Sequence, residues 1–317
     1  MTSKFNTYLI CVSFNNEEKG NCILQQFITS ENARGSKLLF IENGSKKNYE
    51  TYLKDYSNIS NVEIYFSESS NKAKSINYLI REFIKEKEAL IICIDDDIEF
   101  PGTFVSRYQE VAFAKGNNSF FGAGYSVPDS LTNLTLLKYK KLYQSSQFSK
   151  KDFGFQKSKE LIFPGCNFAF FKTQWAYIRG FDERFGPGSN HKLAAQESVF
   201  QKKLKYVGYE AYLVTNNKVV HLPEPDSYNL ESVKKRTKQN GFTHGFQFLI
   251  NSTSVLKFDY FYKVGKMLKS LLEYKIKKRD IDFVHKYYYA RGYLEAAIVY
   301  LRIKNKNSIY HQLKKFK

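Results

Sequence analysis

The feature that most constrains the fold is an apolar run that ends in acidic residues. Residues 89–94 read ALIICI and are followed by Asp95, Asp96 and Asp97. So short and continuous an apolar run is typical of a strand that is covered on both faces, as in parallel sheets. Three adjacent carboxylates at its end repel one another, so their charge must be compensated there.

Further strands and helices alternate along the first half of the chain. Strands are expected over residues 8–14, 37–41 and 62–66, and helices over residues 22–28 and 74–87. This alternation favours an α/β fold with a mainly parallel sheet and helices on both faces. Ligands then bind at the carboxyl ends of the strands, where the sequence places Asn15, Glu42 and Asn43.

The three aspartates predict a divalent metal site. Hard oxygen ligands suit Mg²⁺ or Mn²⁺, which use one or two carboxylates while phosphate oxygens of a substrate complete the shell. The other interpretation of three aspartates is a solvated acidic turn or a helix N-terminus, which favours negative charge. The apolar strand in front of them favours the metal site.

The middle of the chain carries a second set of signals. Residues 161–171 are apolar apart from residues 164–167. They predict two strands on either side of a segment whose backbone packs tightly. Residues 180–188 read GFDERFGPG and predict a loop. The elements expected next are a helix over about residues 193–207, ended by Gly208, and strands over residues 210–214 and 218–221.

The four cysteines indicate neither a zinc cluster nor a disulfide framework. Cys11, Cys22, Cys93 and Cys166 show no CxxC or Cys/His spacing. We therefore expect four reduced, buried thiols.

Positive charge is concentrated near the C-terminus. The chain of 317 residues has a net charge of +18, and residues 226–317 hold 20 Lys and Arg against 7 Asp and Glu. The last proline is Pro225, and the proline-free remainder predicts helices. We therefore expect a catalytic α/β domain over residues 1–225 and a basic helical extension over residues 226–317. Its apolar positions at helical spacing are Leu256, Tyr260, Val264, Met267, Leu268 and Leu271, then Phe283, Tyr287, Ala290, Leu294, Ile298 and Leu301.

The extension admits two interpretations. Cationic amphipathic helices rich in Phe and Tyr suit the surface of an anionic bilayer. The alternative is that their apolar faces pack on the catalytic domain and leave the lysines in solvent. No apolar run approaches the length of a membrane span, and the run near the N-terminus is too short for a signal peptide. We expect a cytoplasmic protein. The alternative is a protein attached peripherally to the inner face of the cell membrane.

The first-half motifs resemble those of family 2 glycosyltransferases of the GT-A fold, in particular the inverting enzymes of bacterial polysaccharide biosynthesis. Residues 12–18 (VSFNNEE) resemble the family's opening strand and loop, and residues 41–45 (IENGS) resemble its second-strand motif. Residues 71–77 resemble the region before the donor-side helix, although Ala73 replaces the usual Gly. Residues 94–97 match the family's Asp-x-Asp signature. Together with the motifs of the second half, the resemblance covers most of residues 7–225.

Motifs of the second half also resemble the family. Residues 165–167 (GCN) resemble its acceptor-side Gly-x-Asn motif, and residues 180–183 match its GFDE motif. Glu197 stands eleven residues before Gly208, where the family has the Asp that deprotonates the acceptor, and Gln196 replaces the usual Glu. Position 197 therefore keeps a carboxylate, on a Glu side chain that is one methylene longer than that of Asp.

The resemblance implies a metal-dependent enzyme that moves a sugar from a nucleotide-diphosphate donor, most often a UDP-sugar, to a saccharide or lipid-linked glycan. Bound Mn²⁺ or Mg²⁺ would neutralise charge on the leaving nucleotide, and Glu197 would act as general base with inversion. It implies donor contacts by Ser13, Asn15, Glu42, Asn71, Lys74, Asp95 and Asp96, acceptor contacts by Gly165, Asn167, Asp182 and Gln196, and metal ligation by Asp97 and His221.

Two other functions stay open at this point. The basic tail is compatible with nucleic-acid binding, and the three aspartates are compatible with a two-metal nucleotidyltransferase. Aromatic residues of the tail fall at helical spacing, however, and residues 13–20 lack a Gly-rich phosphate loop that carries Lys or Arg. We therefore favour glycosyl transfer, as in capsule or lipopolysaccharide synthesis, and expect no nucleic-acid partner.

Overall fold

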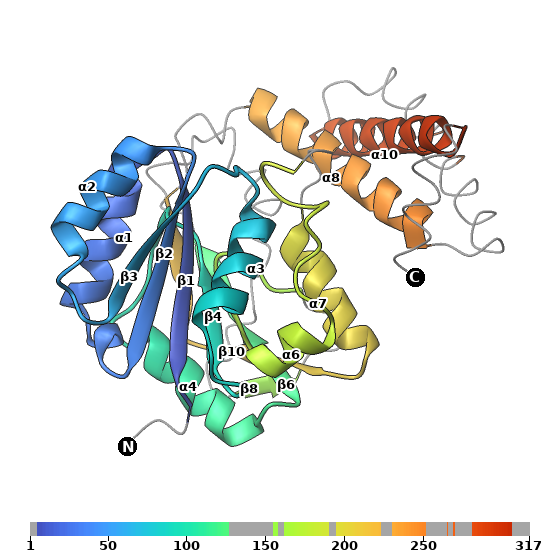
Figure 1. Cartoon of the computed structure of the whole chain (residues 1–317). Helices are drawn as coiled ribbons and strands as arrows, with labels where there is room; N and C mark the ends of the chain where they lie inside the picture. The colour runs from blue at the N-terminus through green and yellow to red at the C-terminus, as the bar shows by residue number, and fades with distance from the viewer. Residues whose placement is uncertain are drawn as a thin grey trace. The chain divides into compact units, whose positions relative to one another are not determined.

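The chain forms two compact units (Figure 1). Unit 1 comprises Met1–Thr132 and Lys140–Pro223, and unit 2 comprises Asn133–Tyr139 and Glu224–Lys317. The computed structural model describes residues 5–126, 155–157, 162–189, 195–222, 230–251, 265, 269 and 281–305. The expected domain boundary after residue 225 lies outside the described residues.

Unit 1 is built on an eight-stranded sheet with the order β3-β2-β1-β4-β9-β6-β10-β8. Its strands are β1 (Thr7–Phe14), β2 (Ser36–Asn43), β3 (Val62–Ser67), β4 (Leu90–Ile94), β6 (Ser119–Gly122), β8 (Phe155–Lys157), β9 (Phe168–Phe171) and β10 (Glu210–Val214). The strands β3, β2, β1 and β4 pair in parallel, whereas β9 is antiparallel to β4 and β6. β10 is parallel to β6 and antiparallel to β8. The predicted mixed, mainly parallel sheet is confirmed.

Helices cover both faces of this sheet (Figure 1). They are α1 (Glu17–Thr29), a short 3-10 turn η1 (Glu31–Ala33), α2 (Lys46–Tyr56), α3 (Lys72–Phe83), α4 (Phe104–Lys115), α6 (Lys172–Tyr177) and α7 (Gln196–Tyr206). Alternate residues of each strand enter opposite core layers: Leu9 packs with α1, α2 and α4, and Ile10 packs with α3 and α7. This period of two buries both faces of the sheet, and the parallel direction of β1, β2, β3 and β4 places the polar residues that follow them at one edge.

A second, three-stranded sheet has the order β5-β11-β7. Its strands are β5 (Ile98–Glu99), β7 (Tyr125–Ser126) and β11 (Val219–His221). β11 pairs with β5 in antiparallel register, with His221 opposite Ile98. Because β5 begins directly after the three aspartates, this pairing carries His221 to the end of β4.

One expected strand does not form. Residues 161–171 were expected to hold two strands, but the described residues 162–167 contain none and only β9 is present. The side chain of Gln201 explains the difference, since its Oε1 accepts from the Phe163 N–H at 2.7 Å and its Nε2 donates to the Phe163 carbonyl at 2.9 Å. The buried amide therefore takes the place of a neighbouring strand at this position.

The cysteines correct a second expectation. Cys11, Cys93 and Cys166 are buried, but Cys22 is exposed. Helix α1 buries Ile23, Leu24 and Phe27, so position 22 faces away from the core. The expectation of four buried thiols is thus wrong for Cys22.

The described residues of unit 2 include the long helices α8 (Leu230–Asn251) and α10 (Ile281–Asn305), which confirm the helical C-terminal segment. Glycines let their backbones touch: a Cβ added at Gly241 would lie 2.0 Å from the Tyr289 carbonyl oxygen, and one at Gly292 would lie 1.8 Å from that of Lys238. The apolar positions expected over residues 256–271 lie outside the described residues. None of the described helices is both long and apolar enough to cross a membrane.

Candidate active site

The candidate site lies at the carboxyl ends of β1, β2 and β4, where a parallel sheet presents its ligand-binding edge. Ser13 at the end of β1 is buried, and its Oγ donates to Asp96 Oδ2 at 2.7 Å. The pKa of Asp96 is raised to about 6 by burial and by its two acidic neighbours, against the hydrogen bond from Ser13. The edge thus concentrates negative charge that the chain neutralises only in part.

A fixed carboxylate lies at the end of β2. Asn15, with φ of 51°, turns its backbone N–H toward Glu42 Oε1 at 2.9 Å, and the Ser45 N–H approaches the same oxygen at 3.4 Å. Burial raises the pKa of Glu42, and these two N–H groups oppose that effect. In the described part of the chain, the buried Oε2 of Glu42 has no hydrogen-bond partner. One acceptor oxygen is therefore left for a ligand.

Two aspartates and a histidine form a possible metal centre. One ligand atom from each of Asp95, Asp97 and His221 can be chosen so that all three lie within 4.8 Å of one another. His221 Nε2 is 3.3 Å from Asp97 Oδ1, and Lys19 Nζ is 3.9 Å from Asp97 Oδ2. Burial and the charge of Asp95 raise the pKa of Asp97 to about 6. Two carboxylates and one imidazole fit Mn²⁺, and the carboxylates also fit Mg²⁺.

Lys72 connects this cluster to Glu197. Its ammonium forms an ion pair with Asp95 and lies 3.4 Å from Glu197 Oε1. Burial alone would lower the pKa of Lys72, but the Asp95 and Glu197 carboxylates raise it well above its usual value. The same lysine holds the pKa of Asp95 below its ordinary range, although burial acts in the opposite direction.

The sequence motif pointed to Lys74 and missed Lys72. Lys74 is exposed on α3, and its contact with a donor stays a prediction. The helical period held the missing signal: Lys72 shares a face with the buried Ile76 and Leu79, whereas Lys74 lies in line with the exposed Tyr78. Lys72 is the first residue of α3 and lies on the buried face of that helix, so its side chain extends into the candidate site.

Glu197 occupies the first turn of α7 and is held by three neighbours. Gln196 Nε2 donates to Glu197 Oε1 at 3.0 Å, and Lys72 approaches that same oxygen. A Cβ added at Gly165 would lie 2.4 Å from the carboxyl carbon of Glu197, so only glycine leaves room for this side chain. Gly165 and Gln196, predicted to contact an acceptor, therefore both lie against the predicted base.

Asn167 is bonded entirely within the protein. Its Oδ1 accepts from the Tyr108 hydroxyl at 2.6 Å, and its Nδ2 donates to the carbonyls of Gly124 and Asn217, each at 2.8 Å. The side chain is fully buried. These bonds use both amide N–H groups, so the contacts give Asn167 a structural role, and its predicted acceptor contact stays a prediction.

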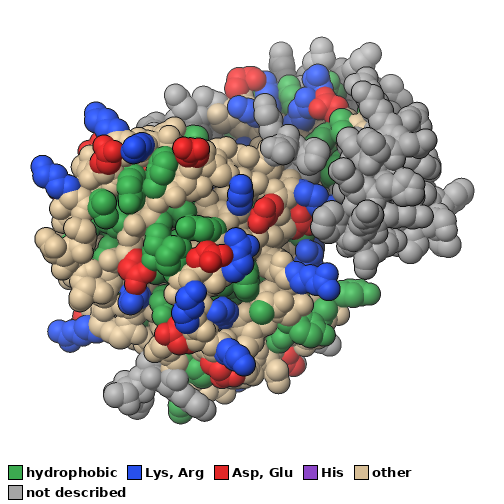
Figure 2. All heavy atoms as spheres, viewed as in Figure 1, with side chains coloured by type: hydrophobic (Ala, Val, Ile, Leu, Met, Phe, Trp, Pro, Cys, Tyr) green, Lys and Arg blue, Asp and Glu red, His purple; other side chains and the backbone are tan. Residues whose placement is uncertain are grey.

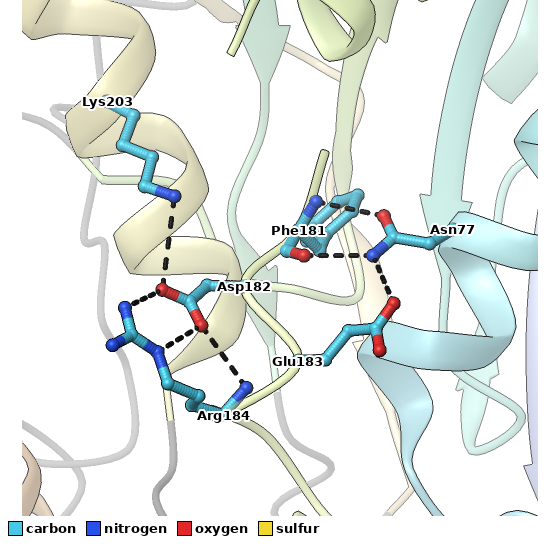
Figure 3. A network of polar contacts seen from close by, with 6 residues as sticks. All are labelled: Asn77, Phe181, Asp182, Glu183, Arg184 and Lys203. Carbon is cyan, nitrogen blue, oxygen red and sulfur yellow. Dashed lines mark hydrogen bonds and ion pairs between the residues drawn. The ribbon is translucent and has the colours of Figure 1, made fainter. Parts of the chain in front are cut away.

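The GFDE loop is anchored on two helices (Figure 3). Asn77 of α3 bonds the Phe181 backbone in both directions, at 2.9 and 2.8 Å, and donates to Glu183 Oε1 at 3.1 Å. Burial alone would raise the pKa of Asp182, but the two-pronged Arg184 pair, at 2.8 and 2.6 Å, lowers it. Lys203 of α7 lies 3.9 Å from Asp182.

The loop also contacts the start of α3. Asn71 caps α3 through its Oδ1, and its Nδ2 donates to the Glu183 carbonyl at 2.7 Å. The Lys72 N–H donates to the Pro187 carbonyl at 3.2 Å. Asn71 thus joins two motifs that the sequence assigned to different substrates.

Acidic and basic side chains are interspersed over the face of unit 1 that Figure 2 shows, with no continuous basic stripe among the described residues.

Comparison with known proteins agrees with this geometry. The family model described as "Glycosyl transferase family 2" matches residues 9–174. The structure of mannosyltransferase PcManGT from Pyrobaculum calidifontis, solved with GDP-Man and Mn²⁺, superposes with a TM-score of 0.59 at 11% identity, over 94% of this chain and 88% of that one. No curated protein matches the sequence.

Two further solved structures share the fold. GalNAc-T7, solved with UDP, GalNAc and Mn²⁺, gives a TM-score of 0.55 at 11% identity, over 83% of this chain and 51% of that one. TarS 1-349 of S. aureus, solved with UDP-GlcNAc, gives a TM-score of 0.50 at 10% identity, over 92% of each chain. Such low identities show a common GT-A fold alone. The family match over residues 9–174, which is more than half of the chain, shows that this protein belongs to glycosyl transferase family 2 and is a glycosyltransferase.

Proposed function

We propose that the protein is an inverting, metal-dependent glycosyltransferase that moves a sugar from a nucleotide-diphosphate donor, a UDP-sugar in the first instance, to a saccharide or lipid-linked glycan. The observation that carries this proposal is the chain of ion pairs from Asp95 through Lys72 to Glu197. It brings a candidate metal centre and a single candidate base to the two sides of one site. A one-step displacement at an anomeric carbon requires that arrangement.

The donor side is assigned to residues at the ends of β1, β2 and β4. Glu42 Oε1 is held by backbone N–H groups, so its buried Oε2 is the acceptor that remains for an N–H of the nucleotide base. Ser13 orients Asp96 through its hydroxyl. Solved neighbours with GDP-Man, UDP and UDP-GlcNAc support a nucleotide-linked donor and leave the base open.

Asp95, Asp97 and His221 would hold the metal ion. When bound, a divalent cation stabilises the negative charge that develops on the leaving diphosphate. Mn²⁺ is present in two of the solved neighbours and matches the mixed oxygen and nitrogen ligand set.

Glu197 is assigned as the general base. Gln196 and Lys72 both engage its Oε1, which leaves Oε2 to accept the proton of the acceptor hydroxyl. The hydroxyl oxygen then bonds to the anomeric carbon as the diphosphate leaves with the electron pair of the broken bond. One base and one displacement give inversion of configuration.

The two units divide these tasks in our proposal. Residues 1–225 form the catalytic domain, and residues 226–317, with 20 basic against 7 acidic residues, form an extension suited to an anionic membrane surface. An acceptor carried on a lipid diphosphate would be met at that surface, as in the synthesis of capsule or lipopolysaccharide.

Calorimetric titration and a donor screen test this function. Wild-type protein should bind UDP or GDP only when Mn²⁺ is present, and it should release the nucleotide from at least one of UDP-glucose, UDP-GlcNAc and GDP-mannose. Glu197→Gln should keep that binding but lower turnover by about a hundredfold or more, because its amide cannot accept the proton. Absence of metal-dependent nucleotide binding would overturn the proposed function, and full turnover by Glu197→Gln would overturn the base.

A further inference from the structure

Lys72 is an unusual cation because two carboxylates with different proposed tasks share it. Its side chain is 14% exposed, its ammonium pairs with Asp95, and Glu197 Oε1 lies 3.4 Å away. Asp95 is also one of the three groups whose ligand atoms cluster within 4.8 Å. The same carboxylate is therefore available to a lysine and to a divalent cation.

These two cations cannot share Asp95 without a penalty. An ammonium and a divalent ion on one carboxylate repel each other strongly in a partly buried site, where water screens little of their charge. The lysine therefore lowers the affinity of the free protein for metal. When a metal ion takes over Asp95, Glu197 is the carboxylate that still pairs with Lys72.

We propose that Lys72 is an internal counter-ion that competes with the metal for Asp95, and that, once displaced, it becomes the positioning residue for Glu197. This inference rests on the proposed function, because it uses Glu197 as base and the Asp95 cluster as metal site. Gln196 already fixes Oε1 of Glu197, so a closer ammonium on that oxygen keeps Oε2 directed at the acceptor. The base is then fully oriented only after the donor side is loaded.

The local structure confines this change to one side chain. The Lys72 N–H donates to the Pro187 carbonyl, and Asn71 caps the helix, so the backbone at residue 72 stays fixed. Movement of the ammonium away from Asp95 and toward Glu197 turns the 3.4 Å contact into a charge-assisted hydrogen bond of ordinary length. Neither α3 nor α7 has to move.

The proposal predicts two effects of opposite sign in Lys72→Met. Removal of the competing ammonium should tighten Mn²⁺ binding to the free protein by about tenfold. Loss of the positioning contact should lower the turnover of nucleotide release by about tenfold, with the donor KM unchanged. A merely structural defect would weaken metal binding and turnover together, and a lysine that only binds donor would raise the donor KM.

The experiment compares Lys72→Met and Lys72→Gln with the wild type in the full-length chain. Equilibrium titration with Mn²⁺ alone, followed by electron paramagnetic resonance of the free ion, gives the affinity. Turnover is measured on the best donor of the screen, and circular dichroism checks the fold. Lys72→Gln keeps a hydrogen-bond donor, so one neutral variant remains if the other fails to fold.

Lys46→Met is the matched control. Lys46 is the first residue of α2, as Lys72 is of α3, but its side chain is 76% exposed and pairs only loosely with Glu50 at 4.0 Å. Its removal takes away the same charge and should leave both measurements within about twofold of the wild type.

Two results would overturn the proposal. Mn²⁺ binding that is unchanged or weaker in both neutral variants would refute the competition, and tighter binding with unchanged turnover would refute the positioning role. A wild-type protein that binds no Mn²⁺ and releases no nucleotide would instead overturn the proposed function itself, so the two failures are distinguishable.

Discussion

The two sides of the candidate site treat their polar groups in opposite ways. At the ends of β2 and β4, Glu42 Oε2 lacks a partner among the described residues, and the pKa values of Asp96 and Asp97 are raised to about 6. On the predicted acceptor side, Asn167 has three internal hydrogen bonds, and Asp182 forms an ion pair with Arg184. Gln196 Oε1 on the predicted acceptor side also lacks a partner among the described residues, so the two sides differ chiefly in their uncompensated carboxylates.

This difference separates groups that hold the fold from groups that await a ligand. An unpaired buried carboxylate costs stability, so it persists where a ligand completes its bonds. A fully bonded amide such as that of Asn167 has little left to offer a substrate. The experiments below test this division, beginning with the largest expected effect.

Asn167→Ala should cause the largest loss of stability. It leaves the Tyr108 hydroxyl and the carbonyls of Gly124 and Asn217 without their partner, which should lower the free energy of unfolding by about 3 to 5 kcal/mol. Urea denaturation measures this loss, and the exposed Asn58→Ala serves as control. A variant of normal stability that only binds acceptor poorly would break the comparison.

Asp97→Asn should abolish function without harming the fold. It removes a charge that burial makes unfavourable, so the metal-free protein should gain about 2 kcal/mol of unfolding free energy at neutral pH, while Mn²⁺-dependent UDP binding weakens by about a hundredfold or more. Calorimetry and thermal unfolding measure the two effects. The exposed Asp55→Asn should alter neither, and nucleotide binding that survives in Asp97→Asn would contradict the assignment.

The pH dependence of the unfolding free energy, compared between the wild type and Asp97→Asn, tests the same assignment. The pKa of Asp97 is about 6 in the folded state and has an ordinary value of 3.8. Between these values Asp97 is more protonated in the folded than in the unfolded state, so its own contribution to stability falls as pH rises from 4 to 6. Relative to the wild type, Asp97→Asn should gain about 2 kcal/mol over this window.

Comparing the two proteins at each pH cancels the titration of carboxylates that do not interact with Asp97, whereas Asp96, whose pKa the Asp97 charge raises, contributes to the difference. Saturating Mn²⁺ should reverse the difference above pH 6, because only the wild type then gains the free energy of metal binding. A difference that stays flat from pH 4 to 6 would mean that the charge of Asp97 is already compensated within the chain.

Arg184→Met should have the smallest effect. Among the described residues, Asp182 then loses its two-pronged side-chain partner and keeps the backbone N–H of residue 184 at 3.2 Å and Lys203 at 3.9 Å. Arg184 is 33% exposed, so solvent screening limits the expected loss of unfolding free energy to about 1 kcal/mol. Urea denaturation beside the exposed Arg34→Met measures it. A loss of turnover at unchanged stability would move Asp182 to the group that awaits a ligand.

Much of the fold was predictable because its signals are local. The strands β1 to β4 are continuous apolar runs, and the polar residues that follow them lie together because parallel strands end at one edge. The position of His221 followed from the order of the motifs, but its place opposite Ile98 depends on pairing between β11 and β5, which no local pattern encodes.

The missing strand at residues 162–167 came from a contact between distant segments, whereas the error at Cys22 came from a helical face that the sequence itself encodes. Phe163 lies in an apolar run that predicts a strand. Its backbone N–H and carbonyl bond instead to the side-chain amide of Gln201, 38 residues away in the sequence. Lys72 and Lys74 are equal in a motif and differ only in which face of α3 they share. The ion pair between Lys72 and Glu197 joins segments that are distant in the sequence, so no sequence spacing predicts it.

Helix α3 and the GFDE loop are matched to each other residue by residue. Asn71 bonds Glu183 across 112 positions of the chain, and a Cβ added at Gly188 would lie 1.9 Å from the Ser70 carbonyl oxygen. Hybrid transferases built by exchanging acceptor halves between relatives would cut between these two segments. A graft that imports the loop without the start of its own α3 would lose this fit, so the two segments should be transplanted together.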